Sequence, residues 1–191
     1  MKYLIGLVGE NGAGKDTFTT FFKTVAAPQS VSRIHFSDVL YDTLKLWGIE
    51  PTRANLQNMA IIMDRQFGKG SLTRATEARI KRQKGDIVIV EGVRWKQDVP
   101  MIRSFANSIL VYITAKPEIR FERLRKRIAG TQGKKLTRAQ FDQEEKALTE
   151  LEIPKIGASA NFKIENNGTL DNFRKHVERF AKRPLDFRYK R

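Results

Sequence analysis

Short apolar runs and longer amphipathic stretches follow one another along the chain. Five apolar runs are rich in Val, Ile and Leu and are bounded by polar or turn-forming residues, which is typical of β-strands. They cover residues 2–8, 32–36, 86–91, 108–114 and 161–165. The runs at 87–90 and 109–113 are apolar throughout. This pattern predicts central strands that helices cover on both faces.

Between these runs, apolar residues recur with helical spacing. The predicted helices cover about residues 15–27, 37–47, 52–67, 71–84, 96–106, 117–129, 137–149 and 169–182. Strands that alternate with helices predict an α/β fold with three layers. We expect a five-stranded parallel sheet in the order 2-3-1-4-5, with helices on both faces and a helical lid.

Three segments stand apart from this alternation within a chain of 191 residues, which fits a single domain. Residues 38–84 form a long helical insertion between the second and third strands. Residues 130–135 place turn-forming residues between two charged helices, which favours a lid over residues 125–150. Residues 183–191 predict an extended basic tail.

Composition narrows the class of protein. Cys is absent, which excludes disulfides and thiolate metal sites. No apolar run reaches the length of a membrane-spanning helix, and the first strand begins too early for a signal peptide. These features predict a cytoplasmic protein that does not bind a membrane.

The net charge of +15 comes from 36 Lys and Arg residues against 21 Asp and Glu residues. Such an excess indicates an anionic partner. Small-molecule kinases surround phosphorylated substrates with cations, whereas nucleic-acid-binding proteins spread cations and aromatic residues over one face. The chain has no nucleic-acid-binding motif, so nucleic acid is the less favoured partner. A monomer and a homodimer both remain open.

The turn after the first strand has the spacing of a phosphate-binding loop, or P-loop. In such a loop, backbone N–H groups and a lysine hold the phosphates of a nucleotide at the N-terminus of a helix. A predicted strand before the turn and a predicted helix after it supply the required context. The expected phosphate-contacting residues are Gly9, Asn11, Gly12, Ala13, Gly14, Lys15, Asp16 and Thr17.

One position in this loop departs from the usual pattern. Most P-loops place a Ser or Thr that ligates Mg²⁺ where this chain has Asp16. A carboxylate is also a suitable Mg²⁺ ligand, directly or through water. The alternative is that Asp16 only caps the helix while Thr17 contacts the α-phosphate.

Two further strands end in residues suited to phosphate chemistry. The third strand ends in Glu91, and Arg94 follows, at the sheet edge where α/β folds bind ligands. Glu91 is expected to hold Mg²⁺ through water or to accept a proton, and Arg94 to grip an acceptor phosphate. Alternatively, the two residues pair only with each other. Ser37 and Asp38 end the second strand and are candidates for acceptor binding or for helix capping.

Two sets of arginines extend this candidate site. Arg120, Arg123 and Arg127 lie on one side of a predicted helix, where their mutual repulsion favours an anion between them. Phosphoryl transfer needs such cations around the transferring group. Arg53 and Arg65 lie on the helical insertion and either contact the acceptor phosphate or are ordinary surface residues.

Together these residues resemble the nucleoside-monophosphate kinase group of P-loop proteins. The run from Gly14 to Thr17 is similar to the GKDT motif of phage-type deoxynucleoside-monophosphate kinases. Arg123 and Arg127 have the spacing of two lid arginines of adenylate kinases, which implies contacts with the donor adenine and the transferring phosphate. The segment 160–170 is similar to the motif A-D-x-x-I-x-N-x-G that dephospho-coenzyme A kinases share, which implies that Asn167 and Gly168 lie near the adenine.

The resemblance implies an ATP- and Mg²⁺-dependent kinase whose acceptor is a nucleoside or deoxynucleoside monophosphate. It implies that Lys15, Arg94, Arg123 and Arg127 act in catalysis and that residues 38–84 bind the acceptor. A dephospho-coenzyme A kinase, with Asp38 or Glu91 as general base, is the first alternative. A nucleic-acid-associated NTPase is the alternative from another class.

Overall fold

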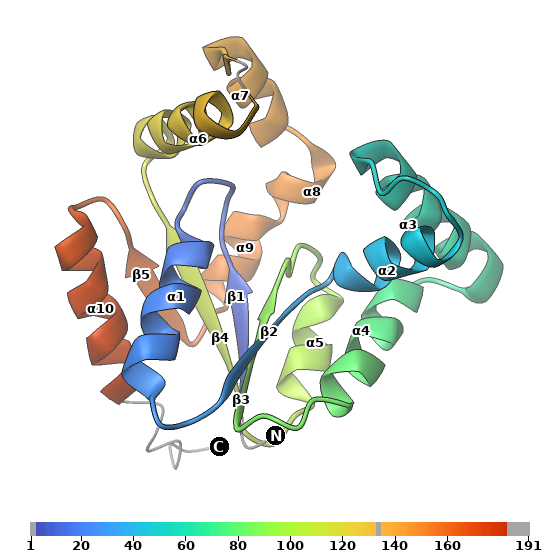
Figure 1. The fold of residues 1–191 in the computed structure, drawn as a ribbon, viewed down its shortest axis with the longest axis horizontal. Helices are drawn as coiled ribbons and strands as arrows, with labels where there is room; N and C mark the ends of the chain where they lie inside the picture. Colours follow the sequence, from blue (N-terminus) through green and yellow to red (C-terminus); the bar gives the residue numbers. More distant parts are fainter. Residues whose placement is uncertain (1–2, 133–134, 183–191) are drawn as a thin grey trace.

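The computed structural model describes residues 3–132 and 135–182 (Figure 1). Its centre is a five-stranded sheet of β1 (Tyr3–Val8), β2 (Val31–His35), β3 (Ile87–Glu91), β4 (Ser108–Thr114) and β5 (Phe162–Glu165). All neighbouring strands are parallel, in the order β2-β3-β1-β4-β5. The predicted fold and strand order are therefore confirmed. The predicted basic tail, 183–191, lies outside the described residues.

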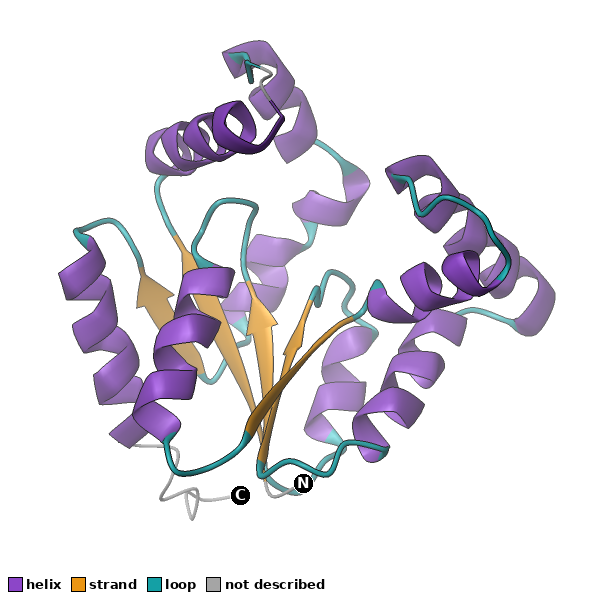
Figure 2. Cartoon of the chain, viewed as in Figure 1, coloured by secondary structure: helices purple, strands orange, loops and turns teal. Residues whose placement is uncertain are grey.

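Helices cover both faces of the sheet (Figure 2). On one face, α1 (Lys15–Ala26) and α10 (Leu170–Lys182) pack on the odd-numbered positions of β1, Ile5 and Leu7. On the other face, α4 (Ser71–Lys81), α5 (Asp98–Arg103) and α9 (Ile153–Ala158) pack on the even-numbered positions, Leu4 and Val8. Because side chains alternate along a strand, one central strand contributes to two separate cores.

The insertion between β2 and β3 consists of α2 (Asp38–Leu46), α3 (Arg53–Phe67) and α4. It has a small core of its own, in which Leu40, Leu44 and Met59 are buried. Thr52 begins α3 because its side chain accepts a hydrogen bond from the backbone N–H of Asn55 at 3.2 Å. The insertion stands beside the carboxyl edge of the sheet (Figure 1).

The predicted lid region contains the end of α6 (Pro117–Gln132), α7 (Arg138–Glu145) and α8 (Leu148–Leu151). The two helices expected on either side of residues 130–135 are present as α6 and α7, but α6 continues through Gly130 and ends at Gln132 rather than at about residue 129. An exposed glycine costs a helix only about 1 kcal/mol, which neighbouring turns can offset. The predicted helix 137–149 ends early, at Glu145. Neither α8 nor α9 was predicted, since helices of 4 and 6 residues are too short for a periodic pattern.

Among the described helices, none combines the length and the apolar character needed to cross a membrane.

Candidate active site

The loop between β1 and α1 has the backbone geometry that phosphate binding requires. Gly14 has a φ of 108°, and a Cβ atom added there would lie 2.4 Å from Nδ2 of Asn166. A Cβ atom added at Gly9 would lie 2.2 Å from the carbonyl oxygen of Ile113. The loop therefore packs so closely on β4 and on the residues after β5 that only glycine fits at these two positions.

Lys15 lies inside this loop. Its Nζ donates hydrogen bonds to the carbonyl oxygens of Gly9 and Glu10, at 2.7 and 3.0 Å. Burial, together with the nearby charge of Arg94, lowers the pKa of Lys15 to about 8, although Glu91, Glu150 and Asp16 oppose the shift. Phosphate oxygens are better partners for an ammonium group than these carbonyl oxygens. The lysine is thus placed to exchange loop contacts for phosphate contacts.

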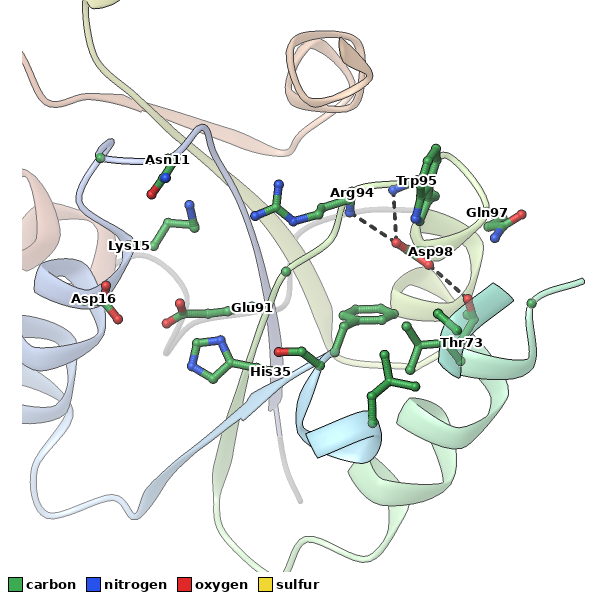
Figure 3. A pocket seen from close by; sticks show the side chains of 18 of the residues that line it. Asn11, Lys15, Asp16, His35, Thr73, Glu91, Arg94, Trp95, Gln97 and Asp98 are labelled. Atoms are coloured by element: carbon green, nitrogen blue, oxygen red, sulfur yellow. Dashed lines mark hydrogen bonds between the residues drawn. The ribbon is translucent and has the colours of Figure 1, made fainter. Parts of the chain in front are cut away.

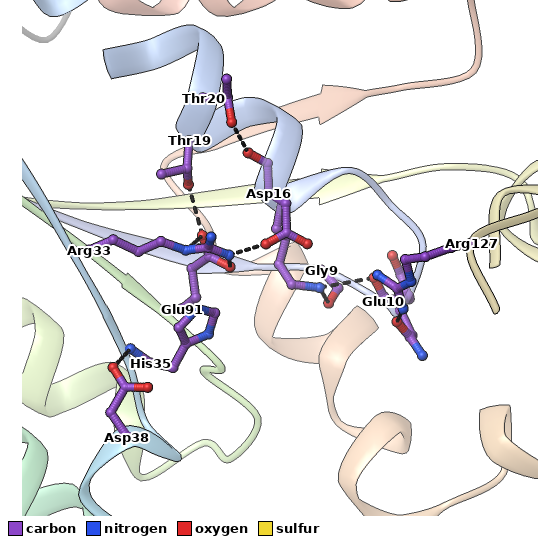
Figure 4. A network of polar contacts seen from close by, with 12 residues as sticks. Gly9, Glu10, Asp16, Thr19, Thr20, Arg33, His35, Asp38, Glu91 and Arg127 are labelled. Carbon is purple, nitrogen blue, oxygen red and sulfur yellow. Dashed lines mark hydrogen bonds and ion pairs between the residues drawn. The ribbon is translucent and has the colours of Figure 1, made fainter. Parts of the chain in front are cut away.

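Asp16 belongs to a network that joins α1, β2 and β3 (Figure 4). The guanidinium of Arg33 forms an ion pair with Oδ1 of Asp16. Arg33 also forms an ion pair with Glu91: its Nη2 donates a hydrogen bond to Oε2 at 2.8 Å, and its Nε lies 2.8 Å from Oε1. Thr19 donates to Oε1 of Glu91 at 2.8 Å. Burial pushes the pKa of Asp16 upward, but the hydrogen bond and charge of Arg33 outweigh it, so this pKa lies below its ordinary value.

This network corrects one alternative and reveals one residue that sequence reasoning missed. Glu91 and Arg94 do not pair with each other, because Glu91 pairs with Arg33 and Arg94 pairs with Glu150 of α8. The N-cap residue of α1 is Gly14, and Asp16 lies in the first turn of the helix, where its side chain accepts a hydrogen bond from Arg33. Arg33 lies within β2, which pairs with β3 in the sheet. A charged residue within such a strand requires a partner, and this was the signal that the sequence offered for Arg33.

The residues present fit a Mg²⁺ ion that arrives with nucleotide phosphates. Within residues 3–132 and 135–182, no group of three or more His, Asp and Glu side chains could hold a metal by itself. Asp16 is exposed, and its Oδ2 accepts no hydrogen bond from these residues. Glu91 is buried and uses both oxygens. One free carboxylate oxygen beside a phosphate loop suits Mg²⁺, which takes one or two carboxylates and completes its shell with phosphates and water.

A cleft of about 1160 Å³ opens between the P-loop and the insertion (Figure 3). Most of the predicted site residues line it: Asn11, Gly12, Gly14, Lys15, Asp16, Thr17, Ser37, Arg65, Glu91, Arg94, Arg123 and Arg127. The structure thus brings the donor and acceptor candidates together around one cavity. The apolar side chains of Phe36, Leu40 and Leu72 form part of its far wall.

Several of the predicted residues, Arg120 among them, do not line this cleft. Gly9 and Ala13 lie behind the loop surface and offer carbonyl oxygens, to Lys15 and to Asn166 respectively. The carboxylate of Asp38 accepts a hydrogen bond from the backbone N–H of His35 at 2.7 Å. Asn167 and Gly168 line a separate small cavity beside α10. The side chain of Arg53 lies outside the part of the structure that is described.

Arg94 follows β3 in a turn that Asp98 holds in place. Asp98 accepts hydrogen bonds from the backbone N–H groups of Arg94 and Trp95, at 3.2 and 3.1 Å, and from the Thr73 hydroxyl at 3.0 Å (Figure 3). Burial raises the pKa of Asp98 above its ordinary value. Asp98 therefore joins α4 of the insertion to the turn that carries Arg94. No local pattern in the sequence indicated this role for Asp98.

The three arginines of α6 have different partners. Arg120 is buried and forms a two-pronged ion pair with Glu145 of α7, at 2.7 and 2.5 Å. Arg120 therefore has an anionic partner within the protein, on α7, that Arg123 and Arg127 do not share among the described contacts. Arg123 donates to the backbone and side-chain oxygens of Asn166, at 3.0 and 3.2 Å, and burial lowers the pKa of Arg123. Arg127 reaches the side-chain oxygen of Asn11 at 3.3 Å.

Asn166 is the third residue, after Arg33 and Asp98, that sequence reasoning missed. It is buried, and its Nδ2 donates to the carbonyl oxygen of Ala13 at 2.9 Å. Together with its contact to Arg123, this bond makes Asn166 a bridge between the P-loop and α6. In the segment that resembles dephospho-coenzyme A kinases, the asparagine of the motif coincides with Asn166 rather than Asn167. The asparagine of that motif lies two residues after its isoleucine, so the position of Ile164 would have identified Asn166.

Comparison with solved structures shows the fold of P-loop kinases. A shikimate kinase from Acinetobacter baumannii, solved with shikimate, has a TM-score of 0.59 at 14% identity, covering 100% of this chain and 97% of its own. A shikimate kinase from Bacteroides thetaiotaomicron has a TM-score of 0.57 at 16% identity, covering 96% and 98%. At such identities the likeness concerns the fold alone.

Comparison of sequences finds relatives of nearly the same length. No family model matches the chain. A UPF0200 protein from Hyperthermus butylicus is 28% identical over 184 residues, 95% of each chain. A UPF0200 protein from Methanosarcina mazei is 30% identical over 179 residues, which are 93% of this chain and 92% of the relative. With that identity over almost the whole of both proteins, the chain belongs to the UPF0200 family.

Proposed function

We propose that this protein is a small-molecule kinase that transfers the γ-phosphate of ATP to a nucleoside or deoxynucleoside monophosphate. The observation that carries the proposal is that cationic side chains outnumber anionic ones in the cleft, and that the anionic ones already have partners. Its cationic side chains are Lys15, Arg65, Lys69, Arg94, Arg123 and Arg127, and its anionic side chains are Asp16, Asp64, Glu91 and Asp98. The excess of cations favours two phosphorylated substrates over one.

All four cleft carboxylates already accept hydrogen bonds from the protein. Asp16 and Glu91 bind Arg33, Asp64 accepts from the backbone N–H of Ser71, and Asp98 accepts from three donors. A hydroxyl acceptor needs a general base, whereas a phosphate acceptor is already an anionic nucleophile. The engaged carboxylates therefore favour a phosphate acceptor. Asp38 and Glu91, the candidate bases of a dephospho-coenzyme A kinase, are among the engaged groups.

On the donor side, the proposal assigns the ATP phosphates to the P-loop backbone and Lys15. Asp16 would hold Mg²⁺ through its free oxygen, and Glu91 would contribute through water; the ion neutralises charge on the β- and γ-phosphates. Arg123 and Arg127 would approach from α6 and bind the adenine and the transferring group. These groups position the phosphates and neutralise their charge, which is the main requirement of phosphoryl transfer.

On the acceptor side, the proposal assigns the monophosphate to Arg94. Its guanidinium now pairs with Glu150, so the acceptor phosphate would replace the carboxylate of a lid residue. Arg65 and Lys69 face the same cleft from the insertion. The apolar wall formed by Phe36, Leu40 and Leu72 is suited to a flat nucleobase.

A coupled assay of ADP release tests this proposal. Each common ribonucleoside and deoxyribonucleoside monophosphate would be supplied with ATP and Mg²⁺, alongside dephospho-coenzyme A and shikimate. We expect turnover with one or a few monophosphates, and none in a Lys15→Ala control preparation. Turnover of dephospho-coenzyme A alone would contradict the proposal in favour of a hydroxyl acceptor. Salt-dependent nucleic-acid binding without any small-molecule turnover would favour the NTPase alternative.

A further inference from the structure

Arg33 joins the two acids of the candidate metal site, and the proposed reaction gives it no role. One guanidinium contacts both carboxylates: Glu91 through Nε and Nη2, each at 2.8 Å, and Asp16 through Nη2 (Figure 4). The register of β2 on β3 places Arg33 opposite Ile89, two residues before Glu91 on the same face of the strand. The contact is therefore built into the sheet rather than made by a free surface side chain.

The two carboxylates would form a different site without this arginine. The side chain of Glu91 is only 3% exposed, and its other described hydrogen-bond donor is the neutral hydroxyl of Thr19. The side chain of Asp16 is 68% exposed and borders the cleft. Two carboxylates so close to one guanidinium repel each other, and a pair of hard oxygen ligands attracts divalent cations. Arg33 thus occupies the place between them where a divalent ion would otherwise be favoured.

The negative charge of Asp16 explains why a cation is needed at this position. In most P-loops the equivalent residue is a neutral Ser or Thr, whereas Asp16 adds a negative charge beside the phosphates. The Arg33 guanidinium cancels this charge while leaving Oδ2 of Asp16 without a hydrogen bond from the described residues. With one cation and two carboxylates, Arg33, Asp16 and Glu91 together carry the same net charge as Glu91 beside a neutral hydroxyl group, and Asp16 still offers one oxygen ligand.

We propose that Arg33 is a positioning residue that acts as a built-in cation. It prevents Asp16 and Glu91 from capturing a divalent ion in the nucleotide-free protein, and it holds Asp16 for an ion that arrives with phosphates. The inference depends on the proposed function only in taking Mg²⁺ as the ion that accompanies the donor. Its test uses nucleotide-free protein and no turnover, so either idea can fail without the other.

The experiment measures Mn²⁺ binding, by electron paramagnetic resonance of free Mn²⁺, to the whole chain without nucleotide. The wild type should bind Mn²⁺ weakly. Arg33→Met should bind it at least about 10-fold more tightly, because a positive charge next to two carboxylates has been removed. Mn²⁺ should also raise the melting temperature of Arg33→Met and leave that of the wild type unchanged. Adding Asp16→Asn to Arg33→Met should abolish both gains.

Two matched variants separate a positioning role from a general change of charge. Arg33→Lys keeps a cation between the acids and should retain weak Mn²⁺ binding. Arg79→Met removes the same charge from a partly exposed ion pair with Asp42 and should leave Mn²⁺ binding unchanged. Equal Mn²⁺ affinity in Arg33→Met and the wild type would overturn the proposal. If Arg33→Met does not fold, even with Mn²⁺ present, the Mn²⁺ affinity of the wild type is the deciding measurement. Tight Mn²⁺ binding that Asp16→Asn removes would overturn the proposal, and weak Mn²⁺ binding would support it.

Discussion

The proposed donor half of the cleft, around the phosphate loop, packs on a large apolar core. The proposed acceptor half, on the insertion, has a much smaller core. Around the donor loop, Phe18, Phe22 and Phe180 pack ring against ring in the large core beneath α1 and α10. Around the acceptor side, the insertion's separate core contains three buried apolar side chains among the described residues, Leu40, Leu44 and Met59. It also exposes large apolar side chains, among them Leu46, Trp47 and Phe67 at 84%, 66% and 63%.

This difference indicates that the two halves have different mechanical roles. The phosphate loop must keep several backbone N–H groups in fixed directions, so close packing on β4 and on Asn166 serves its chemistry. An acceptor region with a small core loses fewer contacts when it shifts around a substrate. We infer that the donor half is rigid and that closure, where it occurs, involves the insertion and the lid.

The largest expected effect concerns the donor half. Lys15→Ala should reduce kcat/KM by about 1000-fold, or about 4 kcal/mol of transition-state stabilisation, because it removes the cation that lies inside the phosphate loop and would neutralise charge on the phosphates. The protein should stay folded, as judged by circular dichroism. Turnover of the variant within a few fold of the wild type would remove the P-loop from the proposed reaction.

The packing difference itself can be measured with one truncation in each half. Phe18→Ala should lower the free energy of unfolding by about 3 kcal/mol or more, since the ring is fully buried among other rings. Met59→Ala should cost about 2 kcal/mol, because its smaller cluster can collapse around the gap. Denaturant titration provides both values. A larger loss for Met59→Ala would show that the insertion is the better packed half.

Arg94 tests whether the far side of the cleft binds the acceptor. Arg94→Lys should raise KM for the monophosphate by about 30-fold, equivalent to about 2 kcal/mol, because an ammonium group cannot reproduce the paired N–H contacts of a guanidinium. KM for ATP should change little. The distant Arg79→Lys serves as a control for loss of a guanidinium. Equal increases in both KM values would place Arg94 on the donor side.

The smallest effect is the uptake of protons when ATP binds. The pKa of Lys15 is about 8 in the free protein, so about half of the molecules carry a neutral lysine at pH 8. Phosphates favour the charged form and raise this pKa, so ATP binding at pH 8 should take up about half a proton, and less at pH 6. Calorimetry in two buffers of different ionisation enthalpy measures this number. Equal uptake at both pH values would mean that Lys15 is already charged at pH 8.

The sequence alone indicated where the strands and the phosphate loop lie. Both depend on patterns within a few neighbouring residues: apolar runs define the strands, and the spacing of Gly9, Gly14 and Lys15 defines the loop. The order of the strands was expected from the parallel α/β class rather than from a local pattern. The prediction failed for α8 and α9, which are too short for a periodic pattern, and it placed the end of α6 about one turn too early.

Only the tertiary structure decided which charges pair. Arg33 meets Glu91 across 58 positions of sequence, and Arg94 meets Glu150 across 56. Such partners are determined by the register of the strands and by the path of the chain from α6 to α8, and no local pattern encodes either. A charged residue can be recognised in a sequence, but burial determines how strongly it requires a partner, and the fold determines which partner is within reach.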